Sequence, residues 1–211
     1  MNDLIDHTYL KPNCTDADID RLCAEARDNG FFAVCVPPYF VSRAVQRLEG
    51  SGVRVATVVG FPFGYGVTAT KVTELQRALE EGADEVDIVI NLAAVKSGDW
   101  AYVRADMDRT VTAARLRGRT SKLIIEAAAL TGAERDRIAE LCNELRPDFV
   151  KTSTGLLGGA TVEDVRYLRD RLDADIRIKA SGGIRTAGEA RSLVEAGADR
   201  LGTSAGLAVV Q

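Results

Sequence analysis

Histidine is almost absent from this sequence, which has one, His7, among its 211 residues. This scarcity excludes a metal centre built on a pair of histidines, and any mechanism that needs several of them. The cysteines at positions 14, 23, 35 and 142 do not have the spacing of metal ligands. We expect no bound metal, and because no export signal opens the chain, we expect reduced thiols and a cytoplasmic protein.

Long apolar runs and basic clusters are also missing. The longest apolar stretches have about 6–8 residues, well short of the roughly 20 that span a bilayer, so we expect no membrane association. The net charge is −4 and there is no run of lysines or arginines, which argues against a nucleic-acid partner. Neither a phosphate-binding Gly-x-x-x-x-Gly-Lys motif nor a dinucleotide fingerprint is present, so we expect no cofactor.

The composition is that of an ordinary folded domain. Hydrophobic residues make up 46% of the chain and charged residues 27%. A chain of this length can bury roughly 70% of the surface that it exposes when unfolded. No linker, low-complexity tract or shift in composition divides it, so we expect one domain over residues 1–211.

Strand-like apolar runs alternate with amphipathic helical stretches along the whole chain. Crossover helices between strands that are apolar on both faces indicate a parallel sheet. Eight such units favour a closed (β/α)8 TIM barrel over an open doubly wound α/β sheet. The predicted strands are residues 4–8, 32–36, 53–60, 85–91, 122–127, 148–154, 176–181 and 200–204.

Two lysines interrupt this apolar pattern late in neighbouring strands, Lys151 in the sixth and Lys179 in the seventh. Catalytic residues of such barrels lie at the C-terminal ends of the strands. A lysine is seldom fully buried unless it is paired, so two inward lysines on consecutive strands favour chemistry over packing. The alternative is that each lysine forms an ion pair with a carboxylate.

A nucleophilic lysine must lose its proton, although an ordinary lysine has a pKa of about 10.4. Strands lie about 4.8 Å apart, which would hold the two nitrogens on the order of 6 Å apart. At an effective dielectric constant near 20 their repulsion is about 2.8 kcal/mol, or roughly two pKa units. Partial burial would bring one of them near pH 7, but this argument does not decide which lysine attacks.

Asp87 is a third candidate, because alternation along residues 85–91 places it on the barrel interior. A carboxylate there could relay protons or serve as an ion-pair partner for a lysine. Asp6 is of the same type and could join this network. For Glu126, which the pattern also places on a strand, the ion-pair interpretation is the stronger one.

Glycine-rich turns follow the seventh and eighth strands. Backbone N–H groups at a glycine turn ahead of a helix can bind an anion, and Gly182 and Gly183 form such a turn. Ser204 opens the loop after the eighth strand. Because phosphate sites of these barrels are often built from these two loops, we predict one here.

The segments that carry these residues read Phe149-Val150-Lys151-Thr152-Ser153-Thr154-Gly155 and Lys179-Ala180-Ser181-Gly182-Gly183-Ile184-Arg185-Thr186. At these residues the chain resembles the deoxyribose-phosphate aldolase family. The resemblance runs nearly end to end, and it also includes residues 5–8, 60–64, 82–87 and 159–165. It implies a class I, metal-independent aldolase that reversibly cleaves 2-deoxy-D-ribose 5-phosphate to acetaldehyde and D-glyceraldehyde 3-phosphate.

The resemblance also implies a role for each candidate. Lys151 would form the Schiff base, Lys179 would lower its pKa and take part in proton transfer, and Asp87 would relay protons. The substrate phosphate would be held by Gly182, Gly183 and Ser204, with Thr154 nearby. Barrels of this kind commonly pair, so we expect a homodimer.

Two departures from the family pattern stand out. Residues 127–130 read Ala-Ala-Ala-Leu where Thr-Cys-Leu-Leu is frequent, and Leu156-Leu157 stand where some members place a lysine or an aromatic residue. Two alternatives stay open at this point. One is a transaldolase-type enzyme that uses a lysine Schiff base on another sugar phosphate. The other is a catalytically idle barrel that serves as a binding module.

Overall fold

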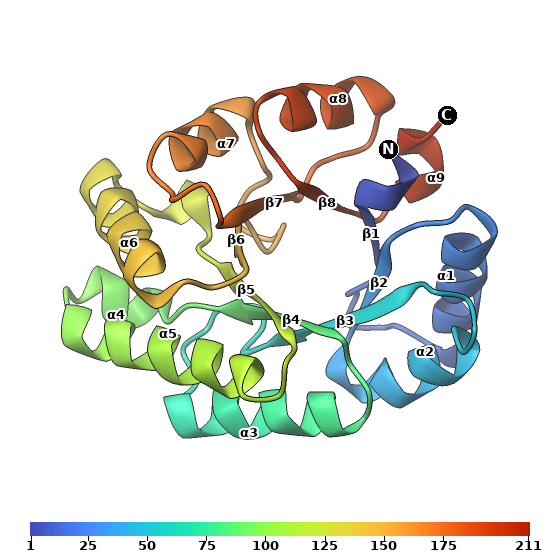
Figure 1. Ribbon diagram of the computed structural model, residues 1–211, viewed down its shortest axis with the longest axis horizontal. Coiled ribbons are helices and arrows are strands. Elements are labelled where there is room, and N and C mark those ends of the chain that lie inside the picture. Colours follow the sequence, from blue (N-terminus) through green and yellow to red (C-terminus); the bar gives the residue numbers. More distant parts are fainter.

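Eight short strands close into a parallel barrel in chain order, with β8 paired to β1. The computed structural model describes residues 1–211, and Figure 1 looks down the barrel. This confirms the predicted TIM barrel. The strands are β1 Ile5–Thr8, β2 Ala33–Val36, β3 Arg54–Val59, β4 Glu85–Val89, β5 Thr120–Ile124, β6 Phe149–Lys151, β7 Arg177–Ser181 and β8 Arg200–Thr203.

Helices form the outer ring around these strands (Figure 1). They are α1 Asp16–Asp28, α2 Val41–Arg47, α3 Thr68–Glu80, α4 Leu92–Lys96, α5 Trp100–Arg115, α6 Gly132–Leu145, α7 Val162–Arg169, α8 Ala187–Glu195 and α9 Gly206–Val209. Three 3-10 turns complete the elements, η1 Asn2–Leu4, η2 Pro38–Phe40 and η3 Ala127–Ala129. None of the helices combines the length and the apolar character needed to cross a membrane.

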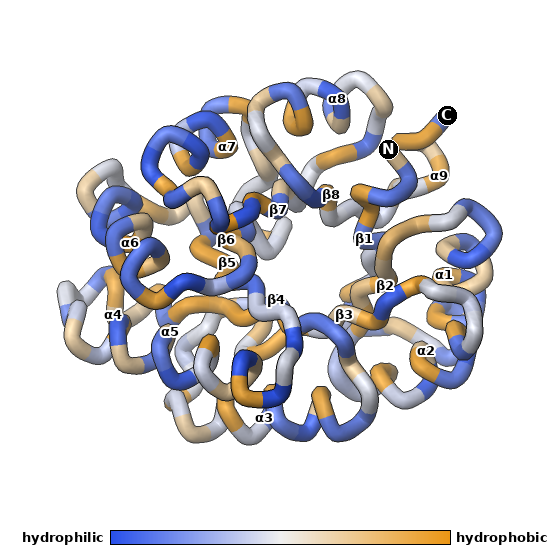
Figure 2. The backbone as a smooth tube through the Cα atoms, viewed as in Figure 1, coloured by the Kyte–Doolittle hydropathy of each residue, from blue (hydrophilic) through white to orange (hydrophobic).

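The main apolar core lies between the strands and the helices and contains 49 buried residues. Val86 and Ile88 of β4 belong to it, as the alternation predicted. The helices alternate between hydrophobic and hydrophilic segments along their length (Figure 2), as expected when each turns one apolar face to the strands. Asp87, which lies between Val86 and Ile88, therefore points into the barrel.

The barrel interior is divided into two parts. A small apolar cluster of Cys35, Ala56 and Val58 covers the side of β2 and β3. From β4 round to β1 the interior carries charged side chains. The strand register places Asp87 beside Lys122 and Lys151 beside Lys179, so these charges lie on neighbouring strands.

The predicted bounds of the fifth and sixth strands differ most from those observed, while the other strands agree within two residues. Residues 148–154 were predicted as a strand, but β6 ends at Lys151. Residues 122–127 were predicted as the fifth strand, but β5 begins and ends earlier, and Glu126 lies beyond it. Glu126 is outside the strand because its backbone is left-handed, with φ 53° and ψ 61°, far from the extended conformation of a strand.

Candidate active site

Lys151 and Lys179 converge on a single oxygen atom. Lys151 is the last residue of β6 and is 3% exposed, and Lys179, in the middle of β7, is fully buried. Their Nζ atoms donate to Oδ2 of Asp87, at 2.7 Å and 2.8 Å. The two nitrogens are therefore no more than the sum of these distances, about 5.5 Å, apart.

Asp87 is enclosed by cations on both of its oxygens, because Lys122 of β5 donates to Oδ1 at 2.7 Å. Burial alone would raise the pKa of Asp87. The positive charges of Lys122, Lys151 and Lys179 outweigh this and hold its pKa well below the usual range. Asp87 is therefore an ionised carboxylate that bridges three ammonium groups.

These contacts belong to a larger charged network in the barrel interior. Lys179 also donates to Asp6 Oδ2, and Arg200 donates to Asp6 Oδ1 at 2.9 Å. Glu85 Oε2 lies 2.6 Å from Lys122 Nζ. The interior network consists of three carboxylates and four basic groups, Asp6, Glu85, Asp87, Lys122, Lys151, Lys179 and Arg200. With all seven ionised these buried groups carry one excess positive charge, which the loss of one lysine proton would balance. Arg54, which is half exposed, lies 3.6 Å from Glu85 Oε1 at the edge of the network.

The structure distinguishes the two candidate lysines. Burial lowers the pKa of Lys151, the charge of Lys179 lowers it further, and the one carboxylate that opposes this is Asp87. Burial would also lower the pKa of Lys179, but Asp6 and Asp87 together reverse the effect and raise it. Lys151 is therefore the amine that gives up its proton more easily.

The largest cause of the lowered pKa of Lys151 is not the one that was expected. Lysine–lysine repulsion was predicted to be the main effect and burial an addition to it. In the structure burial is the largest cause of the lowered pKa of Lys151, and repulsion by Lys179 is smaller. The reason is that Lys151 is almost fully buried, with 3% of its surface exposed, where only partial burial was expected.

A sequence profile of the DeoC/LacD family aldolases matches residues 2–211. The chain belongs to this aldolase family. It is 50% identical over 208 residues to a deoxyribose-phosphate aldolase of Desulfitobacterium hafniense strain Y51, an alignment that covers 98% of this chain and 95% of the relative. It is also 50% identical over 210 residues to one of Thermococcus gammatolerans, which covers 98% and 93%.

Solved structures share the architecture of this DeoC/LacD chain. A chain from Coccidioides immitis, 42% identical, superposes with a TM-score of 0.94 over 99% of this chain and 83% of its own. The deoxyribose-phosphate aldolase of Aeropyrum pernix, described as a tetramer, is 32% identical with a TM-score of 0.92, over 99% and 88%. The family barrel is thus reproduced over essentially the full length of this chain.

The residues of this DeoC/LacD aldolase that were predicted to bind the substrate phosphate lie on three loops. Gly182 and Gly183 follow β7 with φ values of 86° and 78°, a conformation that favours glycine. A Cβ atom on Gly182 would stand 2.9 Å from the Cα of Gly155, so the loops after β6 and β7 touch through their backbones. The N–H groups of Gly182 and Gly183 make no hydrogen bond within the protein.

The backbone amides just before α8 are less available to an anion than the sequence suggested. Glu189 Oε2 accepts hydrogen bonds from the N–H groups of Arg185 and Thr186, at 2.8 Å and 3.0 Å. The amides nearest the start of the helix are therefore occupied by an acidic cap. An anion bound at this turn would therefore accept hydrogen bonds from the N–H groups of Gly182 and Gly183.

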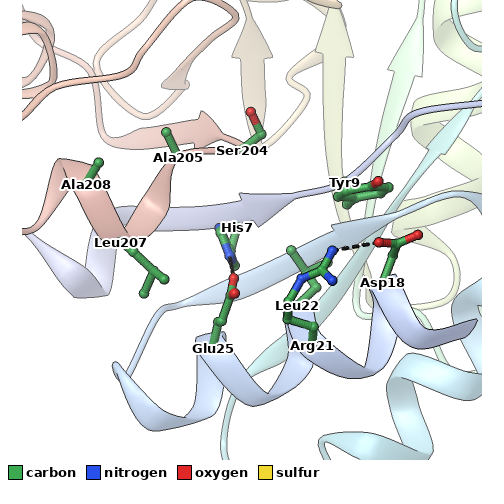
Figure 3. A pocket seen from close by; sticks show the side chains of 10 residues that line it. All are labelled: His7, Tyr9, Asp18, Arg21, Leu22, Glu25, Ser204, Ala205, Leu207 and Ala208. Atoms are coloured by element: carbon green, nitrogen blue, oxygen red, sulfur yellow. Dashed lines mark hydrogen bonds and ion pairs between the residues drawn. The ribbon is translucent and has the colours of Figure 1, made fainter. Parts of the chain in front are cut away.

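Ser204 follows β8 and lines a different cavity from the glycines. Gly182 and Gly183 line a cavity of about 480 Å³, while Ser204 lines one of about 290 Å³ between β1, α1 and α9. Figure 3 shows Ser204 at one edge of the smaller cavity, with His7 pointing toward Glu25. The Nε2 atom of His7 lies 2.7 Å from Glu25 Oε2. Because His7 alternates with the inward Asp6, this cavity lies outside the barrel.

Thr154 is hydrogen-bonded to Glu126. Its N–H group donates to Glu126 Oε2 at 3.1 Å, and its hydroxyl donates to the same oxygen. The ion-pair interpretation of Glu126 is wrong, because its partner is a threonine and not a cation. Thr154 cannot at the same time give this proton to a phosphate.

Sequence reasoning missed three members of the interior network, Lys122, Glu85 and Arg200. The signal was present, because each is a charged residue inside or at the start of a strand-like run, as Lys151 and Lys179 are. Asp6 was correctly placed in the network. The structure contains no group of three or more His, Cys, Asp or Glu side chains that could hold a metal ion.

Proposed function

We propose that this chain is a class I deoxyribose-phosphate aldolase. It would reversibly cleave 2-deoxy-D-ribose 5-phosphate into acetaldehyde and D-glyceraldehyde 3-phosphate. The observation that carries the proposal is the pair of lysines that shares Asp87 inside a barrel of an aldolase family. The 50% identity to deoxyribose-phosphate aldolases over nearly the full chain supports this substrate.

Lys151 is the proposed nucleophile. Its neutral amine attacks the C1 aldehyde of the open-chain sugar, and loss of water gives a protonated imine. The imine accepts the electron pair of the C2–C3 bond as the proton of the C3 hydroxyl is removed, which releases D-glyceraldehyde 3-phosphate and leaves an enamine. Protonation of the enamine at C2 and hydrolysis then free acetaldehyde and Lys151.

Lys179 and Asp87 are the proposed proton-transfer groups. Two carboxylates raise the pKa of Lys179, so this lysine remains an ammonium and keeps its positive charge next to Lys151. Asp87 contacts both amines and provides a hydrogen-bonded path between them. Lys179 thus promotes the neutral form of Lys151, and Asp87 relays protons during formation and hydrolysis of the imine.

The substrate phosphate is assigned to the loops after β7 and β8. The N–H groups of Gly182 and Gly183, free within the protein, suit an anion. Ser204 would contribute from the end of β8, and Thr154 adjoins this region through the contact of Gly155 with Gly182. No metal or cofactor takes part in the proposed reaction.

Borohydride trapping tests the proposal. Reduction in the presence of acetaldehyde should leave an ethyl group on Lys151, found by peptide mass mapping. Lys151→Leu should abolish both the adduct and the cleavage activity, while the melting temperature shows whether the variant folds. An adduct on another lysine would refute the assignment of Lys151. Products other than acetaldehyde and D-glyceraldehyde 3-phosphate would indicate a transaldolase-type reaction.

We further propose that residues 1–211 act as one barrel domain and pair as a homodimer in the cytoplasm. All four cysteines are free thiols, which suits a reducing compartment. Tyr39, Tyr65 and Val67 are largely exposed and offer apolar surface for pairing. Light scattering of the purified chain should give twice the monomer mass, and a monomer mass would refute the dimer.

A further inference from the structure

Glu126 is an unusual residue at the mouth of the barrel. Its side chain is fully buried, yet it has no cation as a partner, and its Oε1 atom has no hydrogen-bond partner. Its backbone is left-handed, with φ 53°, a conformation that costs an ordinary residue roughly 1–2 kcal/mol. A buried carboxylate in a strained backbone persists only where its surroundings hold it in place.

The surroundings that hold Glu126 belong to the segment of the nucleophile. The N–H of Ile125 donates to the carbonyl of Lys151 at 3.0 Å, and the N–H of Ala127 donates to the carbonyl of Thr152 at 2.8 Å. The residues on both sides of Glu126 are thus tied to the end of β6. Its carboxylate therefore has a fixed position relative to Lys151.

The carboxylate acts on Thr154. Oε2 accepts hydrogen bonds from both the N–H and the hydroxyl of Thr154. The N–H of Leu156 donates to the Thr154 hydroxyl oxygen at 3.2 Å. A threonine hydroxyl has one proton and two lone pairs, so its proton and one lone pair are taken. One lone pair remains, and it can only accept a hydrogen bond.

We propose that Glu126 is a positioning residue of the substrate site, which takes the proton of the Thr154 hydroxyl and so directs the remaining lone pair of that oxygen at a substrate hydroxyl. The inference rests on the proposed function. The group recognised is the hydroxyl beside the aldehyde carbon of D-glyceraldehyde 3-phosphate. Thr154 lies in the sequence between Lys151 and Gly155, and Gly155 adjoins Gly182 of the loop after β7.

The measurement is a specificity ratio in the synthesis direction, with acetaldehyde as donor. The acceptors are D-glyceraldehyde 3-phosphate and the analogue that lacks the 2-hydroxyl, 3-phosphooxypropanal. Glu126→Met, which removes the acceptor oxygens, should lower kcat/KM for the hydroxylated acceptor by about tenfold, as expected for one hydrogen bond, and leave the analogue nearly unchanged. Trapping of acetaldehyde on Lys151 should not change, because this step needs no acceptor.

A double-mutant cycle separates action through Thr154 from a general structural effect. Thr154→Val should reduce the ratio as Glu126→Met does, and Thr154→Ser should preserve it. The double variant should lose no more than either single variant. Glu134→Met is the matched control, because Glu134 accepts from the N–H of Thr131 in an ordinary helix cap away from the site. It should leave the ratio unchanged.

Each outcome bears on the inference. Equal losses with both acceptors, or additive losses in the double variant, would overturn it. If Glu126→Met does not fold, an unchanged ratio in Thr154→Val overturns it on its own. If the unmodified protein forms no adduct with acetaldehyde, the proposed function fails. An intact adduct together with a ratio that Glu126→Met does not alter refutes this inference alone.

Discussion

Removal of the Lys179 charge should trap Lys151 in its protonated form. At a separation of at most about 5.5 Å and an effective dielectric constant near 20, the repulsion between the two ammonium groups is at least about 3 kcal/mol. The Lys179→Leu variant loses this repulsion and the excess positive charge of the interior network. Lys151 then balances the remaining charges only while it keeps its proton. Its free-amine fraction at pH 7 should fall by up to about a hundredfold.

The assay is the pH dependence of kcat/KM for cleavage of 2-deoxy-D-ribose 5-phosphate, measured from pH 6 to pH 10. The rise in rate that reports deprotonation of Lys151 should move to higher pH in Lys179→Leu. Borohydride trapping of acetaldehyde should be weak at pH 7 and recover near pH 10. The position of the profile is the critical readout, because loss of a proton donor lowers only its height. A profile that is lower but does not move would refute the reasoning.

Two further predictions concern stability. Burial would raise the pKa of Asp6, but the charges of Lys179, Lys122 and Arg200 lower it to about 2. The ionised form of Asp6 therefore stabilises the fold above about pH 4, and this contribution is lost as the pH falls toward 2. The free energy of unfolding of Asp6→Asn should therefore be about 2 kcal/mol lower than that of the unmodified protein at pH 6. Denaturant titrations should show this difference shrinking below pH 4, and a difference that does not change with pH would contradict the prediction. Gly182→Ala should lower Tm more than Gly118→Ala and also raise KM. Both glycines have positive φ, but only Gly182 has a backbone atom, the Cα of Gly155, within 3 Å of the added Cβ. Equal Tm losses in the two variants would show that crowding by the loop after β6 is unimportant.

Much of this protein was determined by local sequence. Alternation of apolar and charged residues along residues 85–91 placed Asp87 inside and Val86 outside, because successive side chains of a strand point to opposite faces. The regular succession of strands and helices predicted the closed barrel, since parallel strands need crossover helices. The lysines were found by the same rule, as charges in positions where the pattern is apolar.

Only the tertiary structure decided how these side chains are paired. The hydrogen bonds of Asp87 with Lys151 and Lys179 join residues that lie 64 and 92 positions apart in the chain, and Asp6 lies 173 positions from Lys179. Whether a lysine has one carboxylate partner or two depends on closure of the barrel, which brings β1 beside β8. That difference in partners decides which lysine loses its proton. The bond between Glu126 and Thr154 also depends on tertiary structure, because the left-handed backbone after β5 is stabilised by contacts with β6 that no local pattern reveals.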